Sequence, residues 1–175
     1  HQNPEMGNQE FKTAALVAEQ LKSLGLQVRT QVGKTGVVAV LKGGLPGPVM
    51  ALRADMDALP VKEMTGLPWA STVPGKMHGC GHDGHTAMLL GAARVLAERA
   101  RDGRLPGSGT LVLIFQPAEE LGGGGGARRM LEECLFERFP CDAIFGMHNF
   151  PGIAVGEVHV RPGAFMASSD NGWII

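Results

Sequence analysis

The sequence predicts an α/β fold, in which a layered sheet is flanked by helices. Segments with apolar residues at helical spacing alternate along the chain with short apolar segments bounded by glycine or proline, which is typical of buried strands. The 175 residues, of which 44% are hydrophobic, are enough for one compact domain with its own core and too few for two ordinary ones.

Three segments have the apolar spacing of an amphipathic helix. The first spans residues 8–24, with Asn8 as a candidate cap and Gly25 as a stop signal. The second spans residues 86–101, and the third spans residues 127–136. We expect these segments to be the helices that cover the sheet.

Five short apolar segments are expected to form the strands. They are residues 37–41, 49–52, 110–115, 143–147 and 156–160. Polar side chains with catalytic or metal-binding chemistry gather directly after these strands or before a helix. The candidates are Asp55 and Asp57, the segment Cys80 to His85, the pair Glu119 and Glu120, and His148. Open α/β sheets place their sites at the carboxyl ends of strands, so we expect these side chains to converge.

The composition excludes several classes of partner. The 16 basic and 17 acidic residues nearly cancel and are interspersed, so the chain lacks the charge pattern of a protein that binds nucleic acid or an anionic membrane. No apolar run approaches the roughly 20 residues that cross a bilayer. Three cysteines do not make a disulfide framework, and free thiols fit the cytoplasm. The chain begins at His1 rather than at a methionine, so the sequence does not exclude a targeting segment that has been removed.

The segment 79–85 places a cysteine and two histidines among glycines. Glycine lets the backbone turn sharply and bring short ligands close to an ion, and thiolate with imidazole suits zinc or a similar metal. The alternative is a surface loop at a helix start, with Asp83 as the cap and His85 in a similar capping role. Metal binding is the favoured interpretation for Cys80 and His82.

Glu119 and Glu120 are adjacent carboxylates just beyond the expected strand 110–115. Neighbouring side chains there point in different directions, so one can bind a metal while the other handles a proton. The alternative is a solvated acidic helix start. The glycine run 122–126 does not indicate a phosphate-binding loop, because no lysine followed by serine or threonine comes after it at the required spacing.

The remaining candidates are less specific when taken one by one. His148 follows an expected strand, but a lone histidine is more often structural than a ligand. Asp55 and Asp57 share a face of an extended chain, so one of them can orient a ligand histidine, and a simple turn is the alternative. Cys134 and Cys141 are interpreted as small, partly buried residues.

Taken together, the motifs resemble the M20 metallopeptidase family. Within it they are similar to the amidohydrolase branch that holds hippurate hydrolases, N-acetyl amino acid deacetylases and plant hydrolases of auxin conjugates. The segments that carry the resemblance are Ala51-Leu52-Arg53-Ala54-Asp55-Met56-Asp57-Ala58-Leu59-Pro60, His78-Gly79-Cys80-Gly81-His82-Asp83-Gly84-His85, Phe115-Gln116-Pro117-Ala118-Glu119-Glu120 and Gly146-Met147-His148-Asn149. The opening His1-Gln2-Asn3-Pro4-Glu5 resembles the amino-terminal motif of the family.

The resemblance implies a zinc-exopeptidase-like catalytic domain and a site that two divalent ions share. The metals expected first at this site are zinc and manganese, and cobalt and nickel are further candidates. The implied metal ligands are Cys80, His82, Glu120 and His148, and Glu119 would take a proton from water and deliver it to the leaving amine. The substrate would be a small N-acyl amino acid, which is hydrolysed at its amide bond to a carboxylic acid and a free amino acid.

The chain departs from the family pattern in two respects. Other branches of the clan have histidine at the position of Asp55, so Cys80 and His82 would replace that ligand scheme and Asp57 would orient a ligand. Family members are also longer. Residues 1–170 would then be a partial catalytic domain, and residues 171–175 would enter an inserted domain that forms a homodimer and closes over the substrate. A last ligand histidine and the substrate-carboxylate contacts lie beyond this point in the family, so this chain alone should bind metal incompletely and turn over little substrate.

Two alternative functions stay open. One is another activity of the same family, as a dipeptidase or as a deacylase of an N-acyl diaminopimelate. The other is a zinc-binding or thiol-switch module without catalysis. A structural zinc site closes four ligands around one ion and leaves no spare carboxylate, so Glu119 beside Glu120 speaks against such a module.

Overall fold

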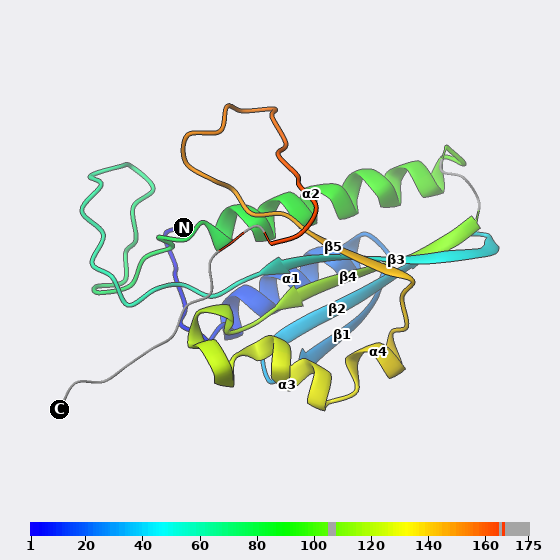
Figure 1. Ribbon diagram of the computed structural model, residues 1–175, viewed down its shortest axis with the longest axis horizontal. Helices are drawn as coiled ribbons and strands as arrows, with labels where there is room; N and C mark the ends of the chain where they lie inside the picture. The colour runs from blue at the N-terminus through cyan, green and yellow to red at the C-terminus, as the bar shows by residue number, and fades with distance from the viewer. Residues whose placement is uncertain (105–107, 165, 167–175) are drawn as a thin grey trace.

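The computed structural model describes residues 1–104, 108–164 and 166, and it contains one mixed sheet with helices on both faces (Figure 1). The strands are β1 (Gln27–Val32), β2 (Gly36–Lys42), β3 (Leu45–Asp55), β4 (Ser108–Gln116) and β5 (Ala143–Gly146). The helices are α1 (Phe11–Ser23), α2 (His82–Arg101), α3 (Gly126–Glu132) and α4 (Leu135–Arg138), with a 3₁₀ helix η1 over Glu119–Gly124. The predicted α/β fold is confirmed.

The strand order of the sheet is β1-β2-β4-β3-β5. β2 pairs antiparallel with β1 and β4, whereas β3 pairs parallel with β4 and β5. The strands β3, β4 and β5 therefore end at the same edge of the sheet, and α2 begins at this edge (Figure 1). Residues from four separate parts of the chain meet there.

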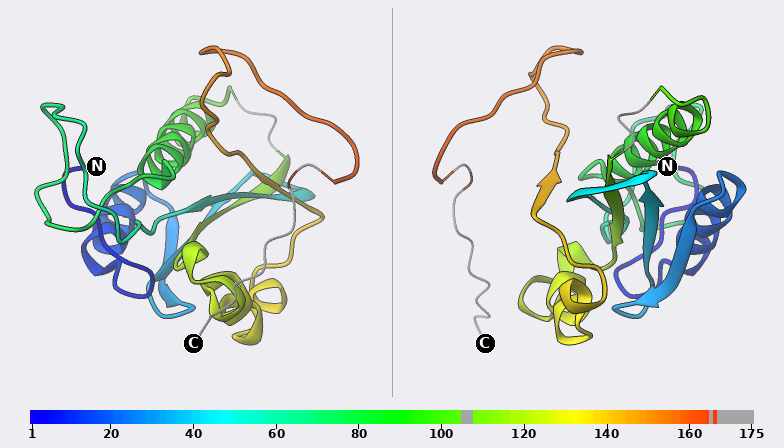
Figure 2. Two further views of the ribbon diagram at one scale, coloured as in Figure 1. Left: turned by 60° about the vertical axis from the view of Figure 1, so that its left-hand side comes forward. Right: turned by 90° about the vertical axis from the view of Figure 1, so that its right-hand side faces the viewer.

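Apolar side chains of the central strands alternate between two core layers. Leu113 and Phe115 of β4 belong to the layer with α1 and α2, whereas Val112 and Ile114 pack with residues of α3 and α4. All four side chains are at most 2% exposed. Helices cover both faces of this strand (Figure 2), which explains its uninterrupted run of apolar residues.

The first helix begins later than predicted, and its expected cap was wrong. α1 starts at Phe11, and Asn8 lies in a turn with φ 63°. The Glu5 carboxylate instead accepts hydrogen bonds from the backbone N–H groups of Lys12 at 3.1 Å and Thr13 at 2.8 Å. The cap is therefore a residue five positions before the helix N-cap position, where local sequence gives no signal.

The other two predicted helices also have different bounds. α2 begins at His82 instead of residue 86, so the histidines of the glycine-rich segment lie on the first turn of the helix and not in a loop before it. The predicted helix 127–136 is two short helices, because Cys134 adopts a left-handed conformation with φ 61° between α3 and α4.

Four of the five predicted strands are present, as β2 to β5. The segment 156–160 is not a strand. Its apolar residues Val158 and Val160 are 72% and 88% exposed, and no strand in the described part of the chain pairs with them. In contrast, β1 was not predicted.

The described helices are all too short or too polar to cross a membrane. Residues 171–175, expected to enter a second domain, lie outside the described residues.

Candidate metal centre

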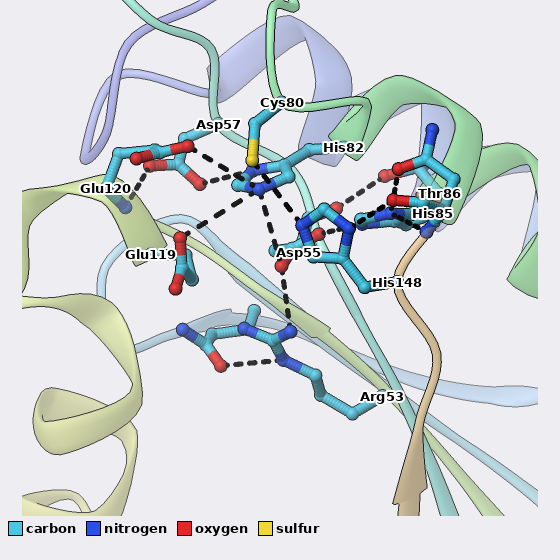
Figure 3. Close-up of polar contacts among 12 residues, drawn as sticks. Arg53, Asp55, Asp57, Cys80, His82, His85, Thr86, Glu119, Glu120 and His148 are labelled. Carbon is cyan, nitrogen blue, oxygen red and sulfur yellow. Dashed lines mark hydrogen bonds and ion pairs between the residues drawn. The ribbon is translucent and has the colours of Figure 1, made fainter. Parts of the chain in front are cut away.

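A cluster of potential metal ligands lies where β3, β4 and β5 end and α2 begins (Figure 3). Three overlapping groups of side chains could each hold a metal ion, because the ligand atoms within each group lie within 4.8 Å of one another. They are Cys80, His82 and His148; Asp55, His82 and His85; and His82, Glu119 and Glu120. His82 belongs to all three groups and so lies at the middle of the cluster. The structure thus brings the predicted site residues together.

The two ring nitrogens of His82, a side chain only 1% exposed, have different surroundings. Nδ1 lies 3.2 Å from Asp57 Oδ1, whereas the buried Nε2 has no hydrogen-bond partner among the described residues. Three carboxylates surround Nε2, with oxygens at 3.6 Å for Asp55, 3.9 Å for Glu119 and 3.7 Å for Glu120. A buried nitrogen without a partner is costly, and a cation placed there would satisfy it and neutralise the carboxylates.

The same surroundings draw positive charge to His82. Burial lowers the pKa of its imidazole, but the hydrogen bond to Asp57 and the charges of Asp55, Asp57 and Glu120 raise the pKa above the ordinary 6.5 overall. A divalent cation at Nε2 would neutralise the surrounding carboxylates, as a proton on the imidazole does. The donors present therefore fit a metal ion.

The Cys80 thiol lies directly before α2, with Sγ 3.4 Å from His148 Nε2. Burial, and after it the hydrogen bond and charge of Glu120, raise the pKa of this thiol to about 12. A thiol in such surroundings becomes a thiolate only beside a cation, which is the state in which cysteine binds zinc. Gly81 has a φ of 89°, which glycine adopts readily, and a Cβ at this position would clash with the Asn149 amide group.

Glu119 and Glu120 begin η1, directly after the left-handed residue Ala118. The side chain of Glu120 is 25% exposed, and its backbone N–H donates a hydrogen bond to Asp57 Oδ2 at 2.9 Å. The side chain of Glu119 is 43% exposed, and burial followed by the charge of Glu120 raises its pKa. The more accessible carboxylate is suited to proton transfer, and the more enclosed one is suited to metal binding.

His85 does not cap the helix, contrary to one of the predictions. It is 3% exposed within the first turn of α2. Its Nδ1 donates to Asp55 Oδ1 at 2.6 Å, and its Nε2 accepts the backbone N–H of Asn149 at 3.0 Å. It thereby ties the end of β3 to the segment that carries His148. Burial alone would raise the pKa of Asp55, but the hydrogen bond with His85 and the charge of Arg53 lower it to about 2.

Three residues that support the cluster were missed in the sequence, namely Arg53, Thr86 and Asn149. Arg53 donates to Asp55 Oδ2 at 2.8 Å and to Gln116 Oε1 at 2.9 Å. The Thr86 hydroxyl donates to the backbone oxygen of Asp55 at 2.9 Å. Arg53 precedes Asp55 by two positions on one strand, so the alternation of side chains along that strand was a usable signal.

Known proteins are similar to this chain in sequence and in fold. The sequence model described as peptidase family M20/M25/M40 matches residues 51–169. Hippurate hydrolase of Campylobacter jejuni is 50% identical over 171 residues, which are 98% of this chain and 43% of that protein. N-acetyl-L-cysteine deacetylase of Bacillus subtilis is 48% identical over 170 residues, which are 97% of this chain and 39% of that protein.

A solved structure agrees with these relatives. It is a dinuclear metal-binding peptidase of the M20 family from Bacillus subtilis, with a TM-score of 0.79 and 45% identity over 89% of this chain and 42% of that chain. The present chain thus spans about two fifths of the length of these relatives. The family match covers more than half of the chain and includes the whole ligand cluster, so the resemblance seen in the motifs is confirmed. This chain belongs to peptidase family M20/M25/M40.

Proposed function

We propose that this chain is the metal-binding part of an enzyme that hydrolyses the amide bond of N-acyl amino acids. The observation that carries the proposal is the buried His82 Nε2, which has no hydrogen-bond partner in the described part of the chain and faces a cluster of thiol, imidazole and carboxylate groups. The relatives at 50% and 48% identity are named for hippurate and N-acetyl-L-cysteine, which are both N-acylated amino acids. The products would be a carboxylic acid and a free amino acid.

The proposed metal ligands of this chain are Cys80, His82, Glu120 and His148. When bound, two divalent cations would lower the pKa of a water molecule and polarise the carbonyl group of the amide. We propose zinc or manganese first, because thiolate and imidazole suit zinc while carboxylates suit manganese. Cobalt and nickel are further candidates.

Glu119 is the proposed general base. It takes a proton from the attacking water and later delivers that proton to the leaving amine. Its raised pKa supports this role, because a base whose pKa is closer to neutrality both accepts and returns a proton more readily. Asp57 keeps the His82 ring in place through Nδ1, so that Nε2 faces the carboxylates and would be available to a cation, and Asp55 holds His85 in the same way.

Changing Asp57 to asparagine is expected to weaken metal binding by about 10- to 100-fold. The variant keeps the size of the side chain but loses the charge that supports both the His82 ring and the Glu120 backbone N–H. Competition with a chelator measures the affinity. Asp142→Asn is the matched control, because Asp142 also accepts a backbone N–H, from Val49 at 2.7 Å, away from the cluster. Equal affinity in the two variants would contradict the role of Asp57.

A substrate screen with the full-length protein tests the proposed activity. N-acetyl, N-benzoyl and N-succinyl amino acids are supplied to metal-loaded protein, and release of the free amino acid is measured. We expect hydrolysis of at least one class, its loss with a chelator and its return with zinc or manganese. Failure on every class would contradict the proposal. Dipeptides belong in the same screen, because the solved relative is named a peptidase and a dipeptide is itself an N-acyl amino acid.

The proposal extends to the assembly and the location of the full-length protein. We propose a homodimer, formed through a domain outside the described residues, that acts in the cytoplasm. The free state of Cys80, Cys134 and Cys141 supports a reducing compartment. The alternative of a non-catalytic zinc module is separated by a metal count: two exchangeable ions per chain favour the enzyme, and one tightly held ion favours the module.

A further inference from the structure

Glu10 is a fully buried glutamate, with 0% exposure, and none of the roles described above uses it. It is the N-cap residue of α1, where a polar side chain ordinarily bonds to the first free N–H groups of its own helix. Glu10 makes no such bond. The Glu5 carboxylate does this instead, by accepting the N–H groups of Lys12 and Thr13. Glu10 is therefore free to point into the protein.

The two carboxylate oxygens of Glu10 each accept one hydrogen bond in the interior. Oε1 accepts the backbone N–H of Ala118 at 2.7 Å, and Oε2 accepts the Thr35 hydroxyl at 2.5 Å. A buried carboxylate is tolerated only where such bonds replace its lost hydration. The first bond joins residues 108 positions apart and ends on the residue directly before Glu119.

Ala118 has an unusual backbone conformation. Its φ of 50° and ψ of 45° are left-handed, although it carries a Cβ and is fully buried. Such a conformation persists only where the surroundings hold it. The Ala118 carbonyl accepts the Gly126 N–H at 3.0 Å, and a Cβ on Gly7 would lie 3.1 Å from Ala118 Cα. The left-handed turn is thus held by hydrogen bonds at its N–H and its carbonyl, and Gly7 lies close to its Cα.

Glu119 is the residue that directly follows the turn at Ala118, and Glu120 lies one residue further along. The backbone N–H of Glu120 donates to Asp57 Oδ2 at 2.9 Å, and the backbone of Glu119 also bonds to the Asp57 carboxylate. The Glu119 side chain is 43% exposed and lies 3.9 Å from His82 Nε2. Loss of the Glu10 contact should therefore act first on Glu119, while the bonds to Asp57 keep the backbone of the proposed ligand Glu120 in place.

We propose that Glu10 is a positioning residue for Glu119. Its carboxylate holds the Ala118 N–H and so fixes the left-handed turn from which Glu119 reaches the metal centre. This inference rests on the proposed role of Glu119 as the base. Glu10 lies outside the three groups of potential ligand residues. Its effect on the rate follows from geometry, since a displacement of about 1 Å can cost on the order of a hundredfold.

Three variants of the full-length enzyme test this role. Glu10→Met removes the acceptor and keeps the volume, and we expect kcat to fall by about 10- to 100-fold while KM and metal content stay within about twofold. Glu10→Gln keeps an oxygen for Ala118 and should recover most of kcat. Thr35→Val is the matched control, because it removes the other partner of the same carboxylate, and its kcat should stay within about twofold of wild type.

Two results would overturn the inference: wild-type kcat in Glu10→Met, or an equal loss of kcat in Glu10→Met and Thr35→Val. If Glu10→Met does not fold, hydrogen exchange of the peptide 116–120 decides. A neutral amide is a weaker acceptor than a carboxylate, so this peptide should exchange faster in Glu10→Gln than in Thr35→Val, and equal exchange would overturn the anchoring. The exchange measurement needs no turnover, so a wild-type protein that hydrolyses nothing would count against the proposed function and not against the anchor.

Discussion

Replacing Glu119 by glutamine is expected to lower kcat by about 10²- to 10⁴-fold and to leave the metal content of the full-length protein nearly unchanged. Glutamine keeps the size and most of the polarity of the side chain, but it cannot take a proton from water. The proposed ligands remain in place in this variant. Steady-state kinetics and elemental analysis on the same preparation measure the two quantities.

Glu120→Gln is the matched control for this experiment. The two residues are adjacent and start the same 3₁₀ helix, so their substitution disturbs the backbone to a similar degree. Because Glu120 is proposed as a ligand, this variant should lose metal as well as activity. If both variants retain metal equally, the division of roles between the two carboxylates is wrong.

Replacing His82 by alanine is expected to have the largest effect on metal binding, because His82 is the residue that belongs to all three groups of potential ligands. Removal of a partner that only supports a ligand costs about 10- to 100-fold in affinity, so loss of a ligand should exceed that range. Hydrolysis should fall to background. Equilibrium dialysis with zinc or manganese, followed by an activity assay, measures both effects.

His159→Ala provides the control for the change of histidine to alanine. His159 is an exposed residue that contacts Glu157 at 3.3 Å and lies outside the ligand cluster. Its substitution should change neither metal affinity nor rate. Undiminished metal binding by the His82 variant would argue against His82 as a ligand.

The fold could be predicted where burial of an element requires a recognisable pattern of apolar residues in the sequence. β4 is covered on both faces, so its apolar run is continuous and was identified. β1 is an edge strand with mostly exposed side chains, and its sequence, Gln27-Val28-Arg29-Thr30-Gln31-Val32, has no such pattern. The prediction of a strand over residues 156–160 was wrong for the opposite reason. Its apolar residues resemble a strand, but a strand also needs a pairing partner, and sequence alternation does not report one.

The ligand cluster could be predicted because its members are chemically conspicuous and follow strand ends. A cysteine between glycines and two adjacent glutamates after an apolar run each have an ordinary structural alternative, but their combination in one chain is specific. The supporting contacts have no comparable signal. Glu10 looks like a solvated acidic residue at a helix start, and only the folded chain reveals its bond to Ala118. The bond between His85 and Asn149 likewise joins positions 64 residues apart.

The most direct test of the metal centre is anomalous diffraction at the zinc absorption edge from crystals of the full-length protein loaded with zinc. The proposed centre predicts zinc bound beside His82 Nε2, with a sulfur ligand from Cys80 at about 2.3 Å and further ligands from Glu120 and His148. Zinc located away from His82, or bound there without the Cys80 sulfur, would contradict the proposed centre.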